Sequence, residues 1–110
     1  MNFGIENPII EEAMLACQAA IDAHIAANPG VWYPCGFAWV KIKPARGRFV
    51  EALKEQKLGS VDDFEGGFLV HPARHATQWM DAKEMGCRAF VAVVKKHYPD
   101  MHIYVTTRID

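Results

Sequence analysis

The chain has 110 residues, of which 51% are hydrophobic and 23% are charged. This composition is typical of a globular protein and excludes a disordered one, and the length suits one domain, residues 1–110, around a single core. Twelve Lys and Arg against 13 Asp and Glu give a formal net charge of −1, so we expect no general electrostatic attraction to nucleic acid or membranes.

The cysteines indicate a reducing compartment. Cys17, Cys35 and Cys87 are odd in number and widely spaced, which fits neither a C-x-x-C motif nor a disulfide framework. Free thiols are typical of the cytoplasm. Residues 1–7 carry no basic and apolar run like that of a signal peptide, and no segment is long and apolar enough for a membrane helix. We therefore expect a cytoplasmic protein without a membrane partner.

The first half of the chain predicts a helix followed by a strand. The helix begins at Asn7-Pro8, where Asn suits the N-cap and Pro the first helical position, and it ends at residues 28–30, Asn-Pro-Gly. Its apolar residues recur at steps of three and four. The strand covers residues 36–43, with apolar residues at even positions and aromatics and lysines at odd positions. We expect the even positions to face the core.

The second half predicts helix, strand, helix and strand. A short helix covers 47–57 and is closed by Gly59 as a C-cap, a strand covers 67–71, a long helix runs over 77–97, and a strand covers 102–107. The fold class is therefore α/β (or α+β), with a three-stranded sheet and three helices in the order αβαβαβ. Helical connections favour parallel strand pairs. Exposed sheet edges favour a homodimer.

The strongest local feature is a run of four cations within eight residues, Lys41, Lys43, Arg46 and Arg48. The last two flank Gly47 where a strand passes into a helix N-terminus, whose backbone N–H groups and dipole favour anions. Glycine permits close approach, and arginine matches phosphate or carboxylate. We predict a site for a phosphate- or nucleotide-like anion, and the alternative interpretation is a solvated basic face. The predicted anion-binding residues are Lys43, Arg46, Gly47, Arg48, Arg74 and Arg108.

Other phosphate and metal motifs are absent from the sequence. There is no P-loop, and Gly66-Gly67 precedes a strand rather than a helix, so no dinucleotide fingerprint exists. His71 and His75 are four residues apart, but Pro72 between them favours a loop. Because no third ligand has a supporting spacing, we predict no metal and no cofactor.

An aromatic cluster lies directly before the basic run. Trp32, Tyr33, Phe37 and Trp39 fall within eight residues. Such residues are typical of cores and protein interfaces, and beside cations they also stack nucleic acid bases. We assign Trp32, Tyr33 and Trp39 to an interface or stacking surface. Single-stranded nucleic acid binding through the strand face of Trp39, Lys41 and Lys43 is an alternative function, ranked lower because the overall charge is acidic.

A second alternative is a Cys-dependent hydrolase built on Cys35. A catalytic thiol needs a nearby base and a lowered pKa, and the sequence places no histidine beside this cysteine. The zinc deaminase signature is also absent. We therefore name no catalytic residue, and we expect a binding protein rather than an enzyme.

Several segments resemble a group of small uncharacterised bacteriophage proteins, which carry a YPCGFAWV-type segment and a C-terminal (S/T)R-x-D. The matching segments are WYPCGFAWV at 32–40, the glycines at 66–67, the stretch at 78–86 and the end of the chain at 104–110. The similarity covers residues 31–110. It implies a phage or prophage origin, a location in the host cytoplasm and a host protein or small molecule as partner. It supplies no catalytic residue.

Overall fold

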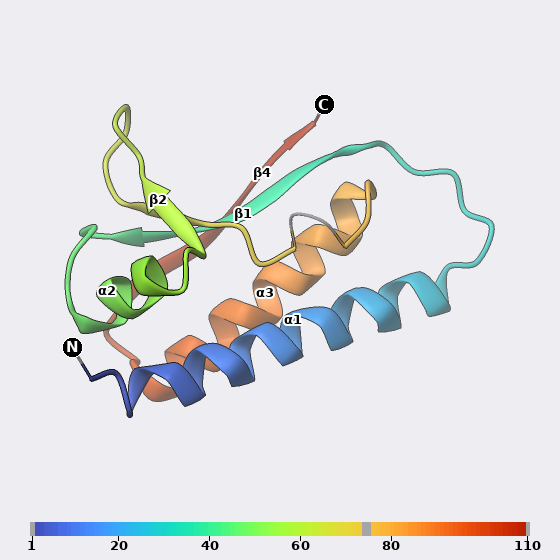
Figure 1. Ribbon diagram of the computed structural model, residues 1–110. Helices are drawn as coiled ribbons and strands as arrows, with labels where there is room; N and C mark the ends of the chain where they lie inside the picture. Colours follow the sequence, from blue (N-terminus) through green and yellow to red (C-terminus); the bar gives the residue numbers. More distant parts are fainter. Residues whose placement is uncertain (1, 74–75, 110) are drawn as a thin grey trace.

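The computed structural model describes residues 2–73 and 76–109 (Figure 1). These residues form three helices and four strands. The three predicted helices and the mixed α and β class are confirmed. The sheet has one strand more than predicted, so the predicted order αβαβαβ is wrong and the order is αβαββαβ. In chain order the elements are α1 (Glu6–Ala27), β1 (Gly36–Lys43), α2 (Arg48–Glu55), β2 (Gly59–Val61), β3 (Phe68–Val70), α3 (Met80–His97) and β4 (His102–Ile109).

The sheet is antiparallel throughout, with strand order β2-β3-β1-β4. The prediction of parallel pairs is therefore wrong. The helical connections do join strands of equal direction, because β1 and β2 both run opposite to β3. However, β3 lies between them, and β1 likewise lies between β3 and β4. This is the split β-α-β arrangement, in which β-α-β-β-α-β forms one antiparallel sheet.

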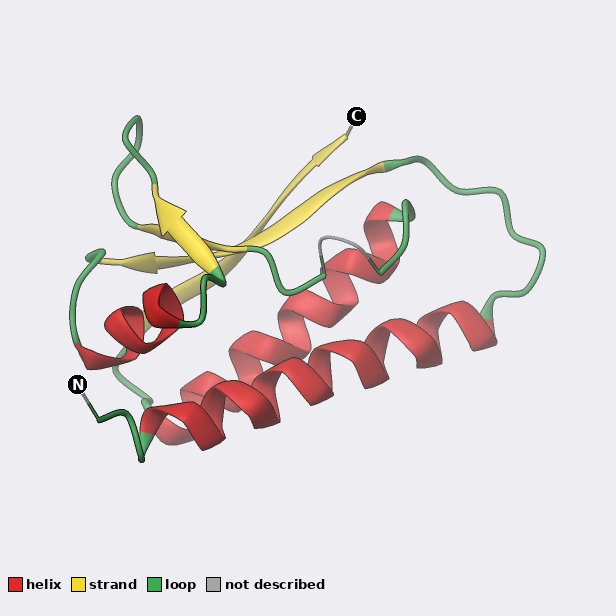
Figure 2. Cartoon of the chain, viewed as in Figure 1, coloured by secondary structure: helices red, strands yellow, loops and turns green. Residues whose placement is uncertain are grey.

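All three helices lie on the same side of the sheet (Figure 2). The even positions of β1 face them, as predicted, and Ala38, Val40 and Ile42 are at most 4% exposed. α1 packs mainly along α3, and α3 packs on β1 and β4. Within the described residues, no helix is long and apolar enough to cross a membrane.

The extra strand, β2, lies between the helix predicted over 47–57 and the strand predicted over 67–71. Gly59 was expected to close α2 in a left-handed conformation, but the residue with positive φ is Lys57, at 58°. Gly59 instead begins β2 and pairs with Val70. A Cβ atom at Gly59 would lie 2.0 Å from the Leu69 carbonyl oxygen. The glycine is therefore required by strand pairing rather than by helix termination.

Candidate functional site

Two turns far apart in sequence line one groove with a cavity volume of about 670 Å³. The turn from β1 to α2 contributes Lys43, Arg46, Gly47 and Arg48, and the turn from α3 to β4 contributes a segment from residue 97 to residue 102. Four of the six predicted anion-binding residues therefore lie together. Gly47 has a φ of 107°, a conformation that side chains disfavour, and it leads directly into the N-terminus of α2.

Arg48 is already engaged by a carboxylate. Its Nε and a terminal nitrogen each lie 3.3 Å from the Glu6 carboxylate oxygens, and the guanidinium also donates to the Asn2 carbonyl. The guanidinium carbon lies 5.3 Å from the centre of the Phe3 ring. This hydrogen bonding lowers the pKa of the Glu6 carboxyl, which is otherwise raised by burial. Arg48 therefore anchors the N-terminal segment, in addition to lining the groove.

Lys43 and Arg46 supply the available positive charge of the groove. Neither forms an ion pair with any residue that the structure describes. The groove also contains His97 and His102, and His97 Nε2 lies 3.0 Å from a carboxylate oxygen of Glu12. The groove thus offers an anion two cations without an ion pair among the described residues. It also offers the N-terminus of α2, where no side chain caps the helix.

Lys41 shares a sheet face with Lys43 but is not available to a ligand. Its side chain is 4% exposed, and its Nζ lies 2.8 Å from Asp62 Oδ2 and 3.3 Å from Glu65 Oε2. Asp62 also accepts backbone hydrogen bonds from Phe64 and Glu65. These contacts fix the turn between β2 and β3 to the centre of β1. They also remove one of the four predicted cations from the basic run.

The remaining predicted anion-binding residues lie elsewhere. Arg108 pairs with Phe37 at the opposite end of the β1–β4 pair. It lines a separate concavity of about 430 Å³, together with Trp39, Thr106 and the turn between β2 and β3. Arg74 lies outside the described residues. The predicted site is thus divided between the groove, which contains Lys43, Arg46, Gly47 and Arg48, and Arg108 at the far end of the sheet.

Of the predicted aromatic residues, Tyr33 contacts Trp79, a residue that sequence reasoning missed. Trp79 is 6% exposed, and its ring stacks on Tyr33 at 4.8 Å and meets His24 at 4.6 Å. Trp32 is 86% exposed, whereas Trp39 is half-buried on the sheet. No local signal identifies Trp79, because it lies next to the predicted helix start and its partners come from two distant segments.

The cysteines occupy two different environments. Cys17 and Cys87 are buried between α1 and α3, and burial raises the pKa of Cys17 to about 11 and that of Cys87 to about 12. Both thiols are therefore protonated and unreactive at neutral pH. Cys35 is exposed and forms an isolated backbone bridge with Trp79. Within the described residues, no group of three or more His, Cys, Asp or Glu side chains could hold a metal ion.

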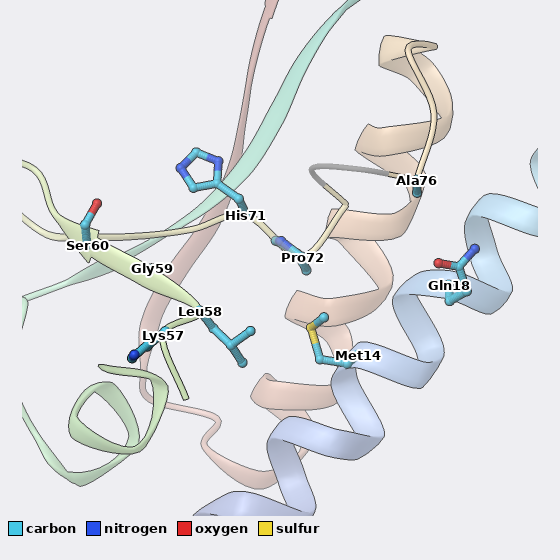
Figure 3. Close-up of a pocket in the computed structure, with 9 residues that line it drawn as sticks. All are labelled: Met14, Gln18, Lys57, Leu58, Gly59, Ser60, His71, Pro72 and Ala76. Carbon is cyan, nitrogen blue, oxygen red and sulfur yellow. The ribbon is translucent and has the colours of Figure 1, made fainter. Parts of the chain in front are cut away.

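A further cavity of about 640 Å³ opens between α1, β2 and the segment after β3 (Figure 3). Among its described lining residues, Lys57 is the only Lys or Arg, and none is a predicted anion-binding residue. These residues suit an anion less well than those of the groove at α2. Its described lining residues are Met14, Gln18, Lys57, Leu58, Gly59, Ser60, His71, Pro72 and Ala76.

Fold and groove together define a small α+β protein with a basic groove at one end of an antiparallel sheet. A scan against protein-family models, a search of curated proteins and a search of solved structures each found no match. The resemblance to bacteriophage proteins stays a prediction.

Proposed function

We propose that the protein is a non-enzymatic binding protein that holds a small anion, of the phosphate or nucleotide class, in the groove at Lys43 and Arg46. The observation that carries this proposal is the convergence of both cations on one cavity at the uncapped N-terminus of α2. Charged donors and helix N–H groups bind phosphate or carboxylate by the same charge-assisted hydrogen bonds. A volume of about 670 Å³ is also large enough for a small-molecule ligand.

Removing both available cations tests the proposal. Lys43→Ala combined with Arg46→Ala is expected to weaken binding of inorganic phosphate more than tenfold, because each charge-assisted hydrogen bond contributes about 1.5–3 kcal/mol. Phosphate binding is measured by NMR titration. Native mass spectrometry of gently purified protein identifies any anion that the wild type retains. Arg48 is left in place because its loss would release Glu6 and the N-terminal segment.

The control removes equal charge outside the groove. Arg88→Ala combined with Lys95→Ala changes two exposed positions of α3 and disrupts only a surface ion pair with Glu84, which contributes little to stability. This variant is expected to bind phosphate like the wild type. Equal affinity of the Lys43/Arg46 variant and the wild type contradicts the proposal.

A second candidate function is protein binding, including homodimer formation, and exposed apolar residues at one end of the sheet favour it. Trp32 is 86% exposed, Phe37 48% and Ile109 68%, and Gly36 pairs with Ile109 where β1 begins. Large exposed aromatics of this kind are typical of interfaces.

Light scattering across a concentration series tests this candidate. The wild type is expected to dimerise, and Trp32→Ser is expected to raise the dissociation constant about tenfold, since a buried Trp commonly contributes more than 1 kcal/mol. Phe64→Ser is the matched control, because Phe64 is 99% exposed at the turn between β2 and β3. A wild type that is monomeric at every concentration contradicts homodimer formation.

A further inference from the structure

The sheet face that the helices leave uncovered continues from the anion groove. Strands β1 and β4 pair along all eight residues of each, and residues at alternate positions share a face. Lys43 and His102 belong both to this face and to the groove. We call the paired residues of the uncovered face the β1–β4 strip. It consists of Phe37–Arg108, Trp39–Thr106, Lys41–Tyr104 and Lys43–His102.

Aromatic rings occur along the β1–β4 strip in fixed positions. The Phe37 ring, 48% exposed, lies 5.3 Å from Lys83 Nζ, which is itself held by the Gly36 carbonyl at 3.0 Å. Tyr104 is half-buried, with its ring centre 5.3 Å from that of His102. Trp39 is half-buried and lines the concavity of about 430 Å³. Rings that are already ordered lose little conformational entropy when a ligand stacks on them.

Positive charge lies at both ends of the β1–β4 strip. Lys43 and Arg46 stand at the groove end, and Arg108 stands at the other end, opposite Phe37. The centre carries no available cation, because Lys41 is paired with Asp62. The distance from residue 37 to residue 43 along a strand is about 20 Å. The surface therefore has a cationic end, a central region in which aromatic rings lie beside the Asp62 and Glu65 carboxylates, and a second cationic end, over the length of a short extended polymer.

We propose that the ligand is single-stranded nucleic acid, laid along the β1–β4 strip. Its phosphates contact Lys43 and Arg46 in the groove and Arg108 at the far end, and its bases stack on the rings between them. This inference rests on the proposed function, because the groove must hold a phosphate. Stacking on aromatics combined with local cations is the general means by which proteins bind single strands. A protein ligand is favoured less, because Lys43, Arg46 and Arg108 place charge at both ends of the strip, at the far end beside the exposed Phe37.

Fluorescence anisotropy with labelled oligo(dT) and oligo(U) twelve-mers tests the proposal. The wild type is expected to bind, and the affinity should fall with salt at a logarithmic slope of roughly −2, as expected for three neutralised phosphates on a single strand. Trp39→Ala and Tyr104→Ala are each expected to weaken binding about tenfold, since one stacked base contributes about 1–3 kcal/mol. Trp39→Phe retains a stacking ring and should keep most of the affinity.

Met85→Ala is the control, because Met85 is an exposed apolar residue of α3, on the side of the sheet opposite to the strip. It should bind both oligonucleotides like the wild type. Unchanged affinity in folded Trp39→Ala protein overturns the inference, and so does a wild type that binds neither oligonucleotide.

Phosphate binding and oligonucleotide binding, measured on the same variants, distinguish a failure of this inference from a failure of the proposed function. If phosphate binds the groove but neither oligonucleotide binds, the inference is wrong and the proposed function stands. If oligonucleotides bind in a Trp39-dependent manner and the Lys43/Arg46 variant binds both oligonucleotides and phosphate like the wild type, the groove is not the anion site. The proposed function is then wrong, and so is the part of the inference that places a phosphate in the groove.

Discussion

Replacing Gly86 with valine is expected to lower the free energy of unfolding by about 2–3 kcal/mol. A Cβ atom at this position would lie 2.8 Å from Cys17 Sγ and 2.8 Å from Ile21 Cγ1, both on α1. These neighbours are 1% exposed and cannot move into solvent. A branched side chain therefore forces α1 and α3 apart along their contact. Urea denaturation followed by circular dichroism measures the change.

Ala92→Val is the matched control for this effect. Ala92 is exposed on α3, so valine there adds a branched residue to the same helix without touching α1. We expect a loss within about 0.5 kcal/mol, as is usual for surface positions. Equal destabilisation by the two valines would mean that α1 and α3 do not pack closely at Gly86.

The helices were predictable because their signals are local. Apolar residues at helical spacing define the buried side of α1, where Ile10, Cys17 and Ile21 are each 1% exposed. Gly86 disfavours a helix by about 1 kcal/mol relative to Ala, a cost that is tolerable where a neighbour packs closely. In the structure this neighbour is α1, through Cys17 and Ile21.

The sheet was predictable only in part because pairing is not local. β2 is three residues long, and two of its residues, Gly59 and Ser60, have no preference for strands. Its strand conformation depends on β3, which is joined to it by an acidic turn. When β2 is not recognised as a strand, the helix α2 would join β1 directly to β3 as a parallel neighbour. The antiparallel pairing of β1 with β3 then cannot be identified from the sequence.

The candidate site was predictable as a cluster of cations but not as a set of available charges. Two of the four cations have carboxylate partners from distant segments, Glu6 for Arg48 and Asp62 for Lys41. The sequence around residues 41–48 does not indicate these partners. The sequence therefore identifies the cluster of cations, and only the structure shows that it lines a groove in which Lys43 and Arg46 carry the available charge.

Asp62→Asn is expected to destabilise the protein near neutral pH. It is also expected to make the free energy of unfolding depend less on pH in the acidic range. In the folded chain the pKa of Asp62 falls from 3.8 to about 2, first because Lys41 donates to it and then because the Phe64 and Glu65 amides do. A depressed folded pKa means that the carboxylate stabilises the fold above about pH 4, and that this stabilisation is lost as the pH falls toward 2. The variant lacks this pH-dependent stabilisation, and it leaves the buried Lys41 ammonium without its closest partner.

Urea unfolding at several pH values between neutral and pH 2 measures the difference between wild type and variant. The denaturation midpoints of the two proteins should lie furthest apart at neutral pH and converge as Asp62 of the wild type becomes protonated. Asp63→Asn is the matched control, because Asp63 is an exposed neighbour with no ion pair among the described residues. It should retain the acid dependence of the wild type. Parallel acid dependence in wild type and Asp62→Asn would mean that the Lys41–Asp62 pair does not fix the turn between β2 and β3 to β1.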